Sequence, residues 1–355
     1  MRILHLIPTL TNGGAERQLA YLTRELRRRG HEVLIVYIQE GLAPAQAADL
    51  PTRKLTSQRH RDPRLLAELI GVIRAWRPAV LQTWYVESDI VGGVAAALTR
   101  TPWVLREPST GAFYRGRAKA WLRKAIAHVA ASAIVANSVD GMAYWSSHRR
   151  RRHIANAVPV DAIDAVPRAS LGTSPVIVYA GRLEAMKNVD VLIAAAAQLQ
   201  DVTLIICGAG PRRKELQRLA GDRVQFRGFT GDVWSIIKGA DLFVSLSDFE
   251  GTPNTVLEAF AARTPTVLSD IDAHRALADE RSAFFAPLRD VAATAAVIRR
   301  ALADRSEAMS RARNARRSAE TMPIAAMARA YEELYSELTA RGGGRGRSDP
   351  TPPAR

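Results

Sequence analysis

The chain has little cysteine, few aromatic residues and no long apolar run. Cys207 is the single cysteine among 355 residues, so no disulfide can form within the chain. This composition is typical of a reducing compartment, and the apolar neighbours of Cys207 indicate a small buried residue. No apolar run approaches the roughly 20 residues that a membrane-spanning helix needs. The first ten residues predict a buried strand rather than a signal peptide. We therefore expect a cytoplasmic protein, either free or peripheral on the inner face of the cytoplasmic membrane.

Acidic residues are also scarce. The chain has 35 acidic and 50 basic residues, a formal net charge of +15, and its basic residues cluster at 27–29, 115–124 and 149–152. Such clusters attract nucleic acid, anionic lipid or phosphorylated substrates, although a solvated basic face explains each cluster equally well. No helix-turn-helix, zinc or RNA-recognition signature is present, and the clusters lack interleaved aromatic residues. A polyanion- or nucleic-acid-binding protein is therefore the least favoured alternative, and we expect no nucleic acid partner.

Short apolar runs alternate with longer helical patterns along most of the chain, which is typical of parallel βαβ units. In the first half, strands are predicted at 3–7, 33–38, 80–83 and 103–106, and helices at 16–29, 63–76 and 88–98. In the second half, strands are predicted at 176–179, 202–207, 224–226, 242–246 and 266–268, and helices at 189–200, 212–220 and 253–263.

The chain is longer than one hydrophobic core usually supports, so two domains are expected. Residues 159–175 are rich in Pro, Ser, Gly and Asp and predict a linker. We predict an α/β protein with two Rossmann-like, doubly wound parallel-sheet domains facing across a cleft, at residues 1–160 and 175–322. A helix at 323–340 is expected to pack back toward the first domain, before a disordered tail at 341–355.

Three glycine sites fall where predicted strands end and helices begin. They are Gly13 with Gly14, Gly181, and Gly208 with Gly210. Glycine at such a position lets backbone amides approach a phosphate, whose charge the helix dipole favours. Each site alone is weak evidence, because a strand-to-helix turn explains Gly208 equally well.

The loop after Gly181 carries two cations. Arg182 can bind a diphosphate through two parallel hydrogen bonds, and Lys187 can supply a point charge. Two solvated loop cations are the simpler alternative.

Two glutamates at a predicted helix start give the strongest local signal. Thr252 is a suitable N-cap and Pro253 a suitable first helical residue, so Glu250 precedes the helix and Glu258 lies in its second turn. A carboxylate in the second turn can accept hydrogen bonds from both hydroxyls of a ribose. An amphipathic helix with two solvated acids is the alternative.

The order of these motifs resembles the GT4 family of retaining glycosyltransferases, which have the GT-B fold. The resemblance covers about residues 1–340 and is most specific over 179–277. It implies that Arg182 and Lys187 bind the donor diphosphate and stabilise the leaving group. It also implies that Glu250 binds hydroxyls of the donor sugar and Glu258 the ribose. Further donor contacts are implied for Gly13, Gly14, Gly181, Gly208, Phe229, Thr252, Pro253, Asn254 and Thr255.

The resemblance implies a hexosyltransferase that needs no cofactor and no metal, with a nucleotide-diphosphate sugar and a glycan or lipid-linked acceptor as its partners. Its pathway would be cell-surface polysaccharide or glycolipid biosynthesis. Glu16, Trp84 and Arg106 are the candidates on the acceptor side, and Trp84 stands where many relatives carry histidine. A sugar-nucleotide epimerase or a phosphorylase on the same scaffold is the main alternative.

Residues 113–129 combine Trp121 and other apolar residues with Arg123, Lys124 and further basic residues. A basic amphipathic helix is typical of membrane-surface docking, which would make an anionic membrane a further partner. A helix packed on its own sheet with a basic outer face explains the pattern equally well.

Overall fold

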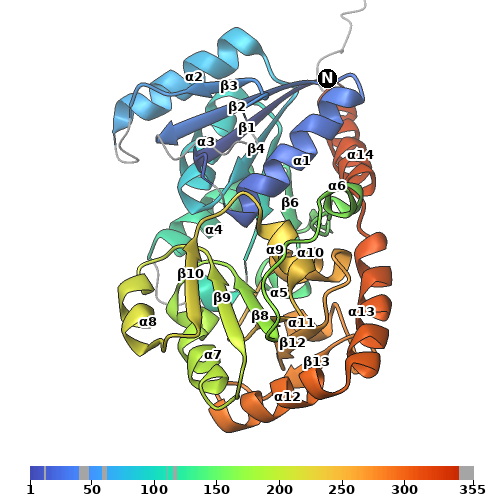
Figure 1. Ribbon diagram of the computed structural model, residues 1–355. Helices are drawn as coiled ribbons and strands as arrows, with labels where there is room; N and C mark the ends of the chain where they lie inside the picture. Colours follow the sequence, from blue (N-terminus) through green and yellow to red (C-terminus); the bar gives the residue numbers. More distant parts are fainter. Residues whose placement is uncertain (12, 40–47, 58–61, 110, 115–117, 344–355) are drawn as a thin grey trace, which may run out of the picture. The chain divides into compact units, whose positions relative to one another are not determined.

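The computed structural model describes residues 1–355 except 12, 40–47, 58–61, 110, 115–117 and 344–355 (Figure 1). The chain divides into two compact units. Unit 1 comprises Met1–Ala157 with Ile324–Arg355, and unit 2 comprises Val158–Pro323.

Unit 1 contains a seven-stranded parallel sheet of order β3-β2-β1-β4-β5-β6-β7. Its strands are β1 (Arg2–Thr9), β2 (Glu32–Gln39), β3 (Thr52–Lys54), β4 (Val80–Trp84), β5 (Trp103–Glu107), β6 (Ala133–Ala136) and β7 (Arg151–His153). Its described helices are α1 (Gly14–Arg28), α2 (Pro63–Trp76), α3 (Val86–Thr99), η2 (Gly111–Tyr114), α4 (Ala118–Ala130), α5 (Val139–Tyr144) and α14 (Ile324–Gly343).

Unit 2 contains a six-stranded parallel sheet of order β10-β9-β8-β11-β12-β13. Its strands are β8 (Val176–Ala180), β9 (Thr203–Cys207), β10 (Val224–Gly228), β11 (Leu242–Ser245), β12 (Thr266–Ser269) and β13 (Phe284–Ala286). Its helices are α6 (Val160–Ala165), η3 (Ala185–Lys187), α7 (Val189–Ala196), α8 (Arg213–Leu219), α9 (Val233–Gly239), α10 (Asn254–Ala261), α11 (Asp272–Arg275), α12 (Val291–Ala303) and α13 (Arg305–Glu320).

The central strands are apolar because helices cover both faces of each sheet. All five residues of β8 are buried, as are all five of β4. In both sheets the first strand in sequence pairs with the second on one side and the fourth on the other, so the strand order reverses beside β1 and beside β8. Ligands of doubly wound sheets bind at the carboxyl ends of the strands at such a reversal.

The prediction of two doubly wound α/β sheets is confirmed. The predicted helix 63–76 has the observed bounds, and α10 begins at Asn254, one residue later than predicted, with Pro253 as its N-cap residue. The sequence analysis missed the short strands β3, β6, β7 and β13, which have three or four residues each. Such short strands carry no periodicity of their own and form only by pairing with a neighbour.

Helix α14 belongs to unit 1 although it follows unit 2 in sequence, and it packs beside α1. Its inner face joins Met327, Tyr331 and Tyr335 to the same core cluster as Leu22 of α1. Within the described part of the chain, no helix has both the length and the apolarity to cross a membrane.

Candidate functional site

Two loops of unit 2 meet where the strand order of its sheet reverses. One follows β8 and covers 181–188, and the other follows β11 and covers 246–253. The Asp248 backbone N–H donates to the Met186 carbonyl over 2.8 Å, which joins the two loops directly. Both predicted catalytic segments therefore lie at the reversal point of one sheet.

Lys187 and Glu250 form an ion pair between these loops, and both side chains are largely buried. Ser247 Oγ donates a second hydrogen bond to the same oxygen, Glu250 Oε1, over 2.7 Å. Burial alone would raise the pKa of Glu250, but the charge of Lys187 and the hydrogen bonds from Lys187 and Ser247 lower it below its usual value. Glu250 is therefore ionised and already paired with one of the two predicted phosphate-binding cations.

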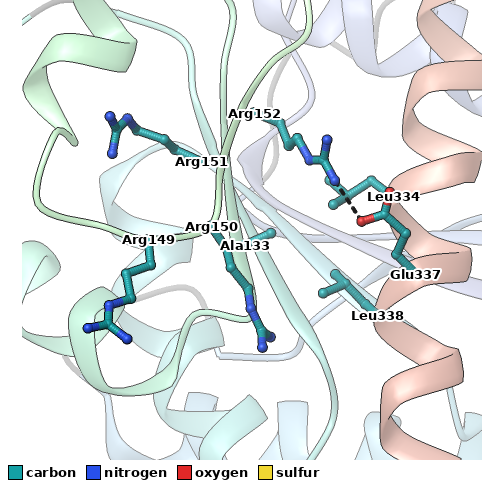
Figure 2. Close-up of a pocket in the computed structure, with 8 residues that line it drawn as sticks. All are labelled: Ala133, Arg149, Arg150, Arg151, Arg152, Leu334, Glu337 and Leu338. Atoms are coloured by element: carbon teal, nitrogen blue, oxygen red, sulfur yellow. Dashed lines mark hydrogen bonds and ion pairs between the residues drawn. The ribbon is translucent and has the colours of Figure 1, made fainter.

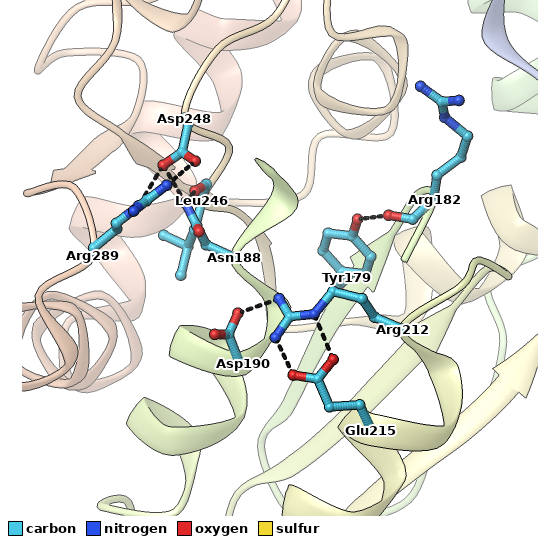
Figure 3. A network of polar contacts seen from close by, with 9 residues as sticks. All are labelled: Tyr179, Arg182, Asn188, Asp190, Arg212, Glu215, Leu246, Asp248 and Arg289. Carbon is cyan, nitrogen blue, oxygen red and sulfur yellow. Dashed lines mark hydrogen bonds and ion pairs between the residues drawn. The ribbon is translucent and has the colours of Figure 1, made fainter. Parts of the chain in front are cut away.

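Arg182 differs from Lys187 because its side chain is 63% exposed. Its backbone is held, since Tyr179 Oη donates to the Arg182 carbonyl over 2.8 Å (Figure 3). Its guanidinium forms a 2.9 Å ion pair with Glu184. An exposed pair of this kind contributes little to stability and is readily exchanged for another anion.

Asn188 links the two loops through hydrogen bonds of its side chain, a role that was not predicted from the sequence. It adopts a left-handed backbone conformation (φ 49°) and is buried. Its Nδ2 donates to the Leu246 carbonyl over 2.9 Å and to Asp248 Oδ1 over 2.7 Å (Figure 3). Arg289 donates from Nε to the same carboxylate over 2.9 Å and lowers the pKa of Asp248, against the opposing effect of burial. Asparagine suits this position because it tolerates the left-handed region.

Helix α10 carries the second glutamate of the predicted pair. Glu258 lies in the second turn of this eight-residue helix and is 3% exposed. Thr252 directly precedes the N-cap residue Pro253, and Asn254 and Thr255 form the first turn. The predicted order along the helix start is thus observed, displaced by one residue.

Gly208 is required by packing. It has a φ of 140°, and a Cβ there would lie 1.9 Å from the Gly181 carbonyl oxygen. The Gly208 N–H donates to the Gly228 carbonyl. Phe229, which follows Gly228, has a half-exposed side chain. The glycines at 181 and 208 therefore let the loops after β8 and β9 touch.

In unit 1, Glu16 lies at the corresponding reversal point beside β1 and β4. Thr11 Oγ1 donates to its Oε1 over 2.9 Å, and Tyr85 Oη donates to its Oε2 over 3.1 Å. A Cβ at Gly13, the N-cap residue of α1, would lie 2.3 Å from Oε2 of Glu16, so glycine there leaves room for the carboxylate. Gly14 is the first residue of the helix.

Tyr85 was missed by the sequence analysis. It has a φ of 74° in the residue between β4 and α3, which is strained for a side chain of this size. Such strain clusters at functional sites, and here it brings the Tyr85 hydroxyl to Glu16.

Trp84 and Arg106 lie beneath the surface, each about 1% exposed. The Arg106 guanidinium stacks 4.4 Å from the centroid of the Trp84 ring. Arg106 Nε donates to Tyr331 Oη over 3.1 Å, and its Nη2 donates to Asn156. Within unit 1 these contacts tie α14 to the sheet. The geometry therefore supports a structural role for both residues.

Two family models match the chain, one in each half. A model described as "Glycosyltransferase Family 4" matches residues 12–161, and one described as "Glycosyl transferases group 1" matches residues 174–304. The chain belongs to the GT4-type group 1 glycosyltransferases. The resemblance drawn from the motifs is thereby confirmed.

Similar sequences are glycosyltransferases of several kinds. The lipopolysaccharide core biosynthesis glycosyltransferase LpsE of Rhizobium meliloti is 31% identical over 201 residues, which cover 54% of this chain and 58% of LpsE. The alpha-D-kanosaminyltransferase of Streptomyces kanamyceticus is 34% identical over 116 residues, which cover 30% of each chain. The matched stretches thus span between about a third and three fifths of these two relatives.

Solved structures share the fold over nearly the whole chain. HepE of Anabaena in complex with UDP-glucose superimposes with a TM-score of 0.85 at 20% identity, covering 95% of this chain and 100% of that one. Sucrose-phosphate synthase of Thermosynechococcus elongatus gives 0.78 at 21% identity, covering 96% and 100%. The expected GT-B fold class is therefore confirmed.

Helix α4 corrects one expectation. Arg123 is fully buried, where its Nε donates to Asp89 and its Nη1 to Glu107, each over 2.6 Å. Arg123 therefore cannot contact a membrane. The Nζ of Lys124 lies 4.0 Å from the centroid of the Tyr144 ring. The expected basic residue Lys119 is exposed on this helix, and so are the apolar residues, since Trp121 is 77% exposed and Leu122 and Val129 also lie at the surface. Arg115 and Arg117 lie outside the described residues.

Glu107 is the centre of this buried cluster. Its Oε2 accepts from Arg123 Nη1 and from Trp145 Nε1, and its Oε1 accepts from Tyr114 Oη and the Ser109 N–H. A buried carboxylate is tolerated only when its oxygens are fully hydrogen-bonded. The cluster holds the segment after β5 against the sheet.

The basic cluster at 149–152 lies on and beside the edge strand β7. Arg149, Arg150, Arg151 and Arg152 line a hollow of about 290 Å³ with Ala133, Leu334, Glu337 and Leu338. Figure 2 shows Arg150 and Arg152 on the side of α14, where Arg152 pairs with Glu337 over 2.7 Å, and Arg149 and Arg151 on the other side. Charged residues on an edge strand prevent pairing with other chains, which accounts for this cluster.

Among the described residues, no three His, Cys, Asp or Glu side chains gather closely enough to hold a metal ion.

Proposed function

We propose that the chain transfers a hexosyl sugar from a nucleoside-diphosphate sugar to a glycan or lipid-linked acceptor, with retention of the anomeric configuration and without a metal. The carrying observation is the Lys187–Glu250 pair at the reversal point of the unit 2 sheet, beside the start of α10. It places a cation suited to a diphosphate beside a carboxylate suited to sugar hydroxyls.

The cations supply the charge stabilisation in this mechanism. The C1–O bond to the diphosphate breaks as the acceptor oxygen bonds to C1 from the same face, and the acceptor proton passes to the departing phosphate. Negative charge grows on the leaving phosphate, so Arg182 and Lys187 stabilise the transition state more than the ground state. Glu258 binds the ribose from the second turn of α10, and Thr252, Pro253, Asn254 and Thr255 border the phosphate and the sugar.

The relatives favour a uridine or other nucleoside-diphosphate donor and a surface glycan product. HepE was solved with UDP-glucose, and LpsE is named for lipopolysaccharide core biosynthesis. Cell-surface polysaccharide or glycolipid biosynthesis is accordingly the proposed setting. Glu16, held by Thr11 and Tyr85, is the acceptor-side carboxylate in this proposal.

A binding screen tests the donor class. Thermal unfolding is measured with UDP-, GDP- and ADP-sugars and with each free nucleotide, since a ligand of the native state raises the melting temperature by mass action. At a concentration of 100 times Kd the stabilisation is about 2.7 kcal/mol. Absence of a shift with every nucleotide sugar would refute the proposed function.

A labelled donor then separates transfer from the rival reactions. The label moves to an acceptor in a transferase, whereas a sugar-nucleotide epimerase isomerises the donor without one. A phosphorylase needs phosphate for turnover. Turnover in the absence of both acceptor and phosphate would favour the epimerase.

A membrane surface is the second proposed partner. The exposed Trp121 and Leu122 on α4 are the observation that favours it, because tryptophan and leucine on a surface helix insert at the headgroup boundary. The protein would then be peripheral on the inner face of the cytoplasmic membrane.

A further inference from the structure

His274 lies near the Lys187–Glu250 pair and has no role in the sugar transfer proposed for this site. It belongs to α11, directly after β12, and its side chain is completely buried. The three groups are close enough to interact electrostatically, since Glu250 raises and Lys187 lowers the pKa of His274. The sequence analysis gave no signal for it, because a lone histidine on a short helix has no pattern.

A chain of hydrogen bonds connects His274 to the glutamate. His274 Nδ1 lies 2.8 Å from the Ser269 carbonyl oxygen. Ser269 Oγ donates to the Ser247 carbonyl over 2.6 Å, and Ser247 Oγ donates to Glu250 Oε1. The ends of β11 and β12 thereby hold the imidazole and the carboxylate in a common frame.

The Ser269 contact determines which nitrogen of His274 carries the proton. A carbonyl oxygen only accepts hydrogen bonds, so Nδ1 must be the donor. Burial lowers the pKa of His274 below 6.5, with Lys187 acting in the same direction, so the ring is neutral near pH 7. Nε2 is then a hydrogen-bond acceptor.

This acceptor has no partner. Nε2 of His274 is buried and makes no hydrogen bond to any described residue. Lys187 and Ser247 both donate to Oε1 of Glu250, and no hydrogen bond links its Oε2 to the described part of the chain. A buried acceptor without a partner is destabilising and calls for an explanation in a native structure.

We propose that His274 is a donor-sugar specificity residue, whose Nε2 accepts a hydrogen bond from one sugar hydroxyl while Glu250 accepts from a neighbouring hydroxyl. The ligand class follows from the chemistry of the cluster. His274 Nε2 and the Glu250 carboxylate are two hydrogen-bond acceptors, and the cluster has no free neutral donor. It therefore suits a ligand group that donates two hydrogen bonds, as a pair of neighbouring sugar hydroxyls does. The inference rests on the proposed function and names the part of the donor that this site reads.

The test uses two substitutions that each retain one hydrogen-bonding function of the imidazole. In His274→Asn the amide nitrogen can keep the Nδ1 bond to Ser269, but the Nε2 acceptor is lost. In His274→Gln the longer side chain can place an acceptor near the Nε2 position. Affinities of the wild type and both variants are measured by calorimetry for the nucleotide sugar found in the thermal screen and for its free nucleoside diphosphate.

We expect His274→Asn to weaken nucleotide-sugar binding about tenfold with nucleoside-diphosphate affinity unchanged, and His274→Gln to recover most of the loss. A donor analogue lacking the recognised hydroxyl should bind wild type and His274→Asn equally. Equal nucleotide-sugar affinity of wild type and His274→Asn would overturn the proposal, as would a parallel loss of nucleoside-diphosphate binding, which marks a folding role. Failure of the wild type to bind any nucleotide sugar would instead refute the proposed function.

Discussion

Lys187 and Glu250 form an ion pair although 63 positions separate them in sequence. The pair joins the loop after β8 to the loop after β11, which are neighbouring strands of one parallel sheet. In a doubly wound sheet these two loops meet where the strand order reverses, so residues distant in sequence converge on one ligand site. The pair also restrains both side chains before any substrate arrives, which lowers the entropy lost on binding.

Lys187→Ala is expected to lower kcat about 100-fold, equivalent to about 3 kcal/mol of transition-state stabilisation. The loss arises because the ammonium offsets charge on the departing phosphate. Steady-state kinetics with the labelled donor measure the effect. The companion Glu250→Gln keeps a side chain of the same size and should mainly weaken sugar binding. A Lys187→Ala enzyme with near-normal turnover would contradict the mechanism.

Arg182→Ala should also lower kcat about 100-fold, but without loss of stability, because its side chain is 63% exposed and its ion pair spans only two residues. Arg281→Ala is the matched control, since Arg281 forms a similar exposed pair with Asp279, also two residues away. Turnover and the melting temperature are measured for both variants. Equal turnover of the two would show that the Arg182 charge does not act on the phosphate.

Arg123→Met should destabilise unit 1 by about 3–5 kcal/mol, because it leaves the carboxylates of Asp89 and Glu107 buried without their shared counterion. Urea denaturation followed by tryptophan fluorescence measures the loss, since Trp145 donates to Glu107. Lys119, on the same helix as Arg123, forms an exposed pair with Glu87 of α3, and Lys119→Ala should cost less than about 1 kcal/mol. Comparable losses of stability in the two variants would contradict the burial of the Arg123 ion pairs.

Trp121→Ser should reduce association with vesicles of anionic phospholipid severalfold, because the exposed indole supplies apolar area at the headgroup boundary. Vesicle sedimentation measures the bound fraction. Leu219→Ser on α8 of unit 2 removes another exposed apolar side chain and serves as the control. Unchanged sedimentation of Trp121→Ser would remove the case for docking through α4.

Stability should fall as the pH is lowered below about 6.5, in part because of His5. Burial, aided by the charge of Arg106, lowers the pKa of His5 from 6.5 to about 3. Between these values the unfolded chain binds a proton that the folded chain excludes, so unfolding becomes easier at about 1.4 kcal/mol per pH unit.

The variant His5→Asn isolates this contribution of His5. Its amide oxygen can still accept a hydrogen bond, as His5 Nδ1 does from Trp84 Nε1, but it does not titrate. The free energy of unfolding between pH 6.5 and pH 4 should therefore decline less steeply than in the wild type. An identical slope would show that His5 does not control the acid sensitivity.

The α/β class, the helix at 63–76 and the positions of the two glutamates around α10 were accessible from sequence. Each depends on local information: alternation of apolar runs, helix-start residues and a spacing within one helix. The donor-side motifs could be found for the same reason, since each occupies one continuous segment after a strand.

The partners of these residues emerged only in three dimensions. Arg123 belongs to a basic amphipathic pattern, yet packing of α4 against α3 buries it against Asp89. Arg106 lies in β5 and contacts α14, which comes from the far end of the chain. The role proposed for His274 depends on Ser269, at the end of β12, and on Glu250, in the loop after β11. Burial and pairing are set by contacts between distant segments, and no local pattern encodes which segments meet.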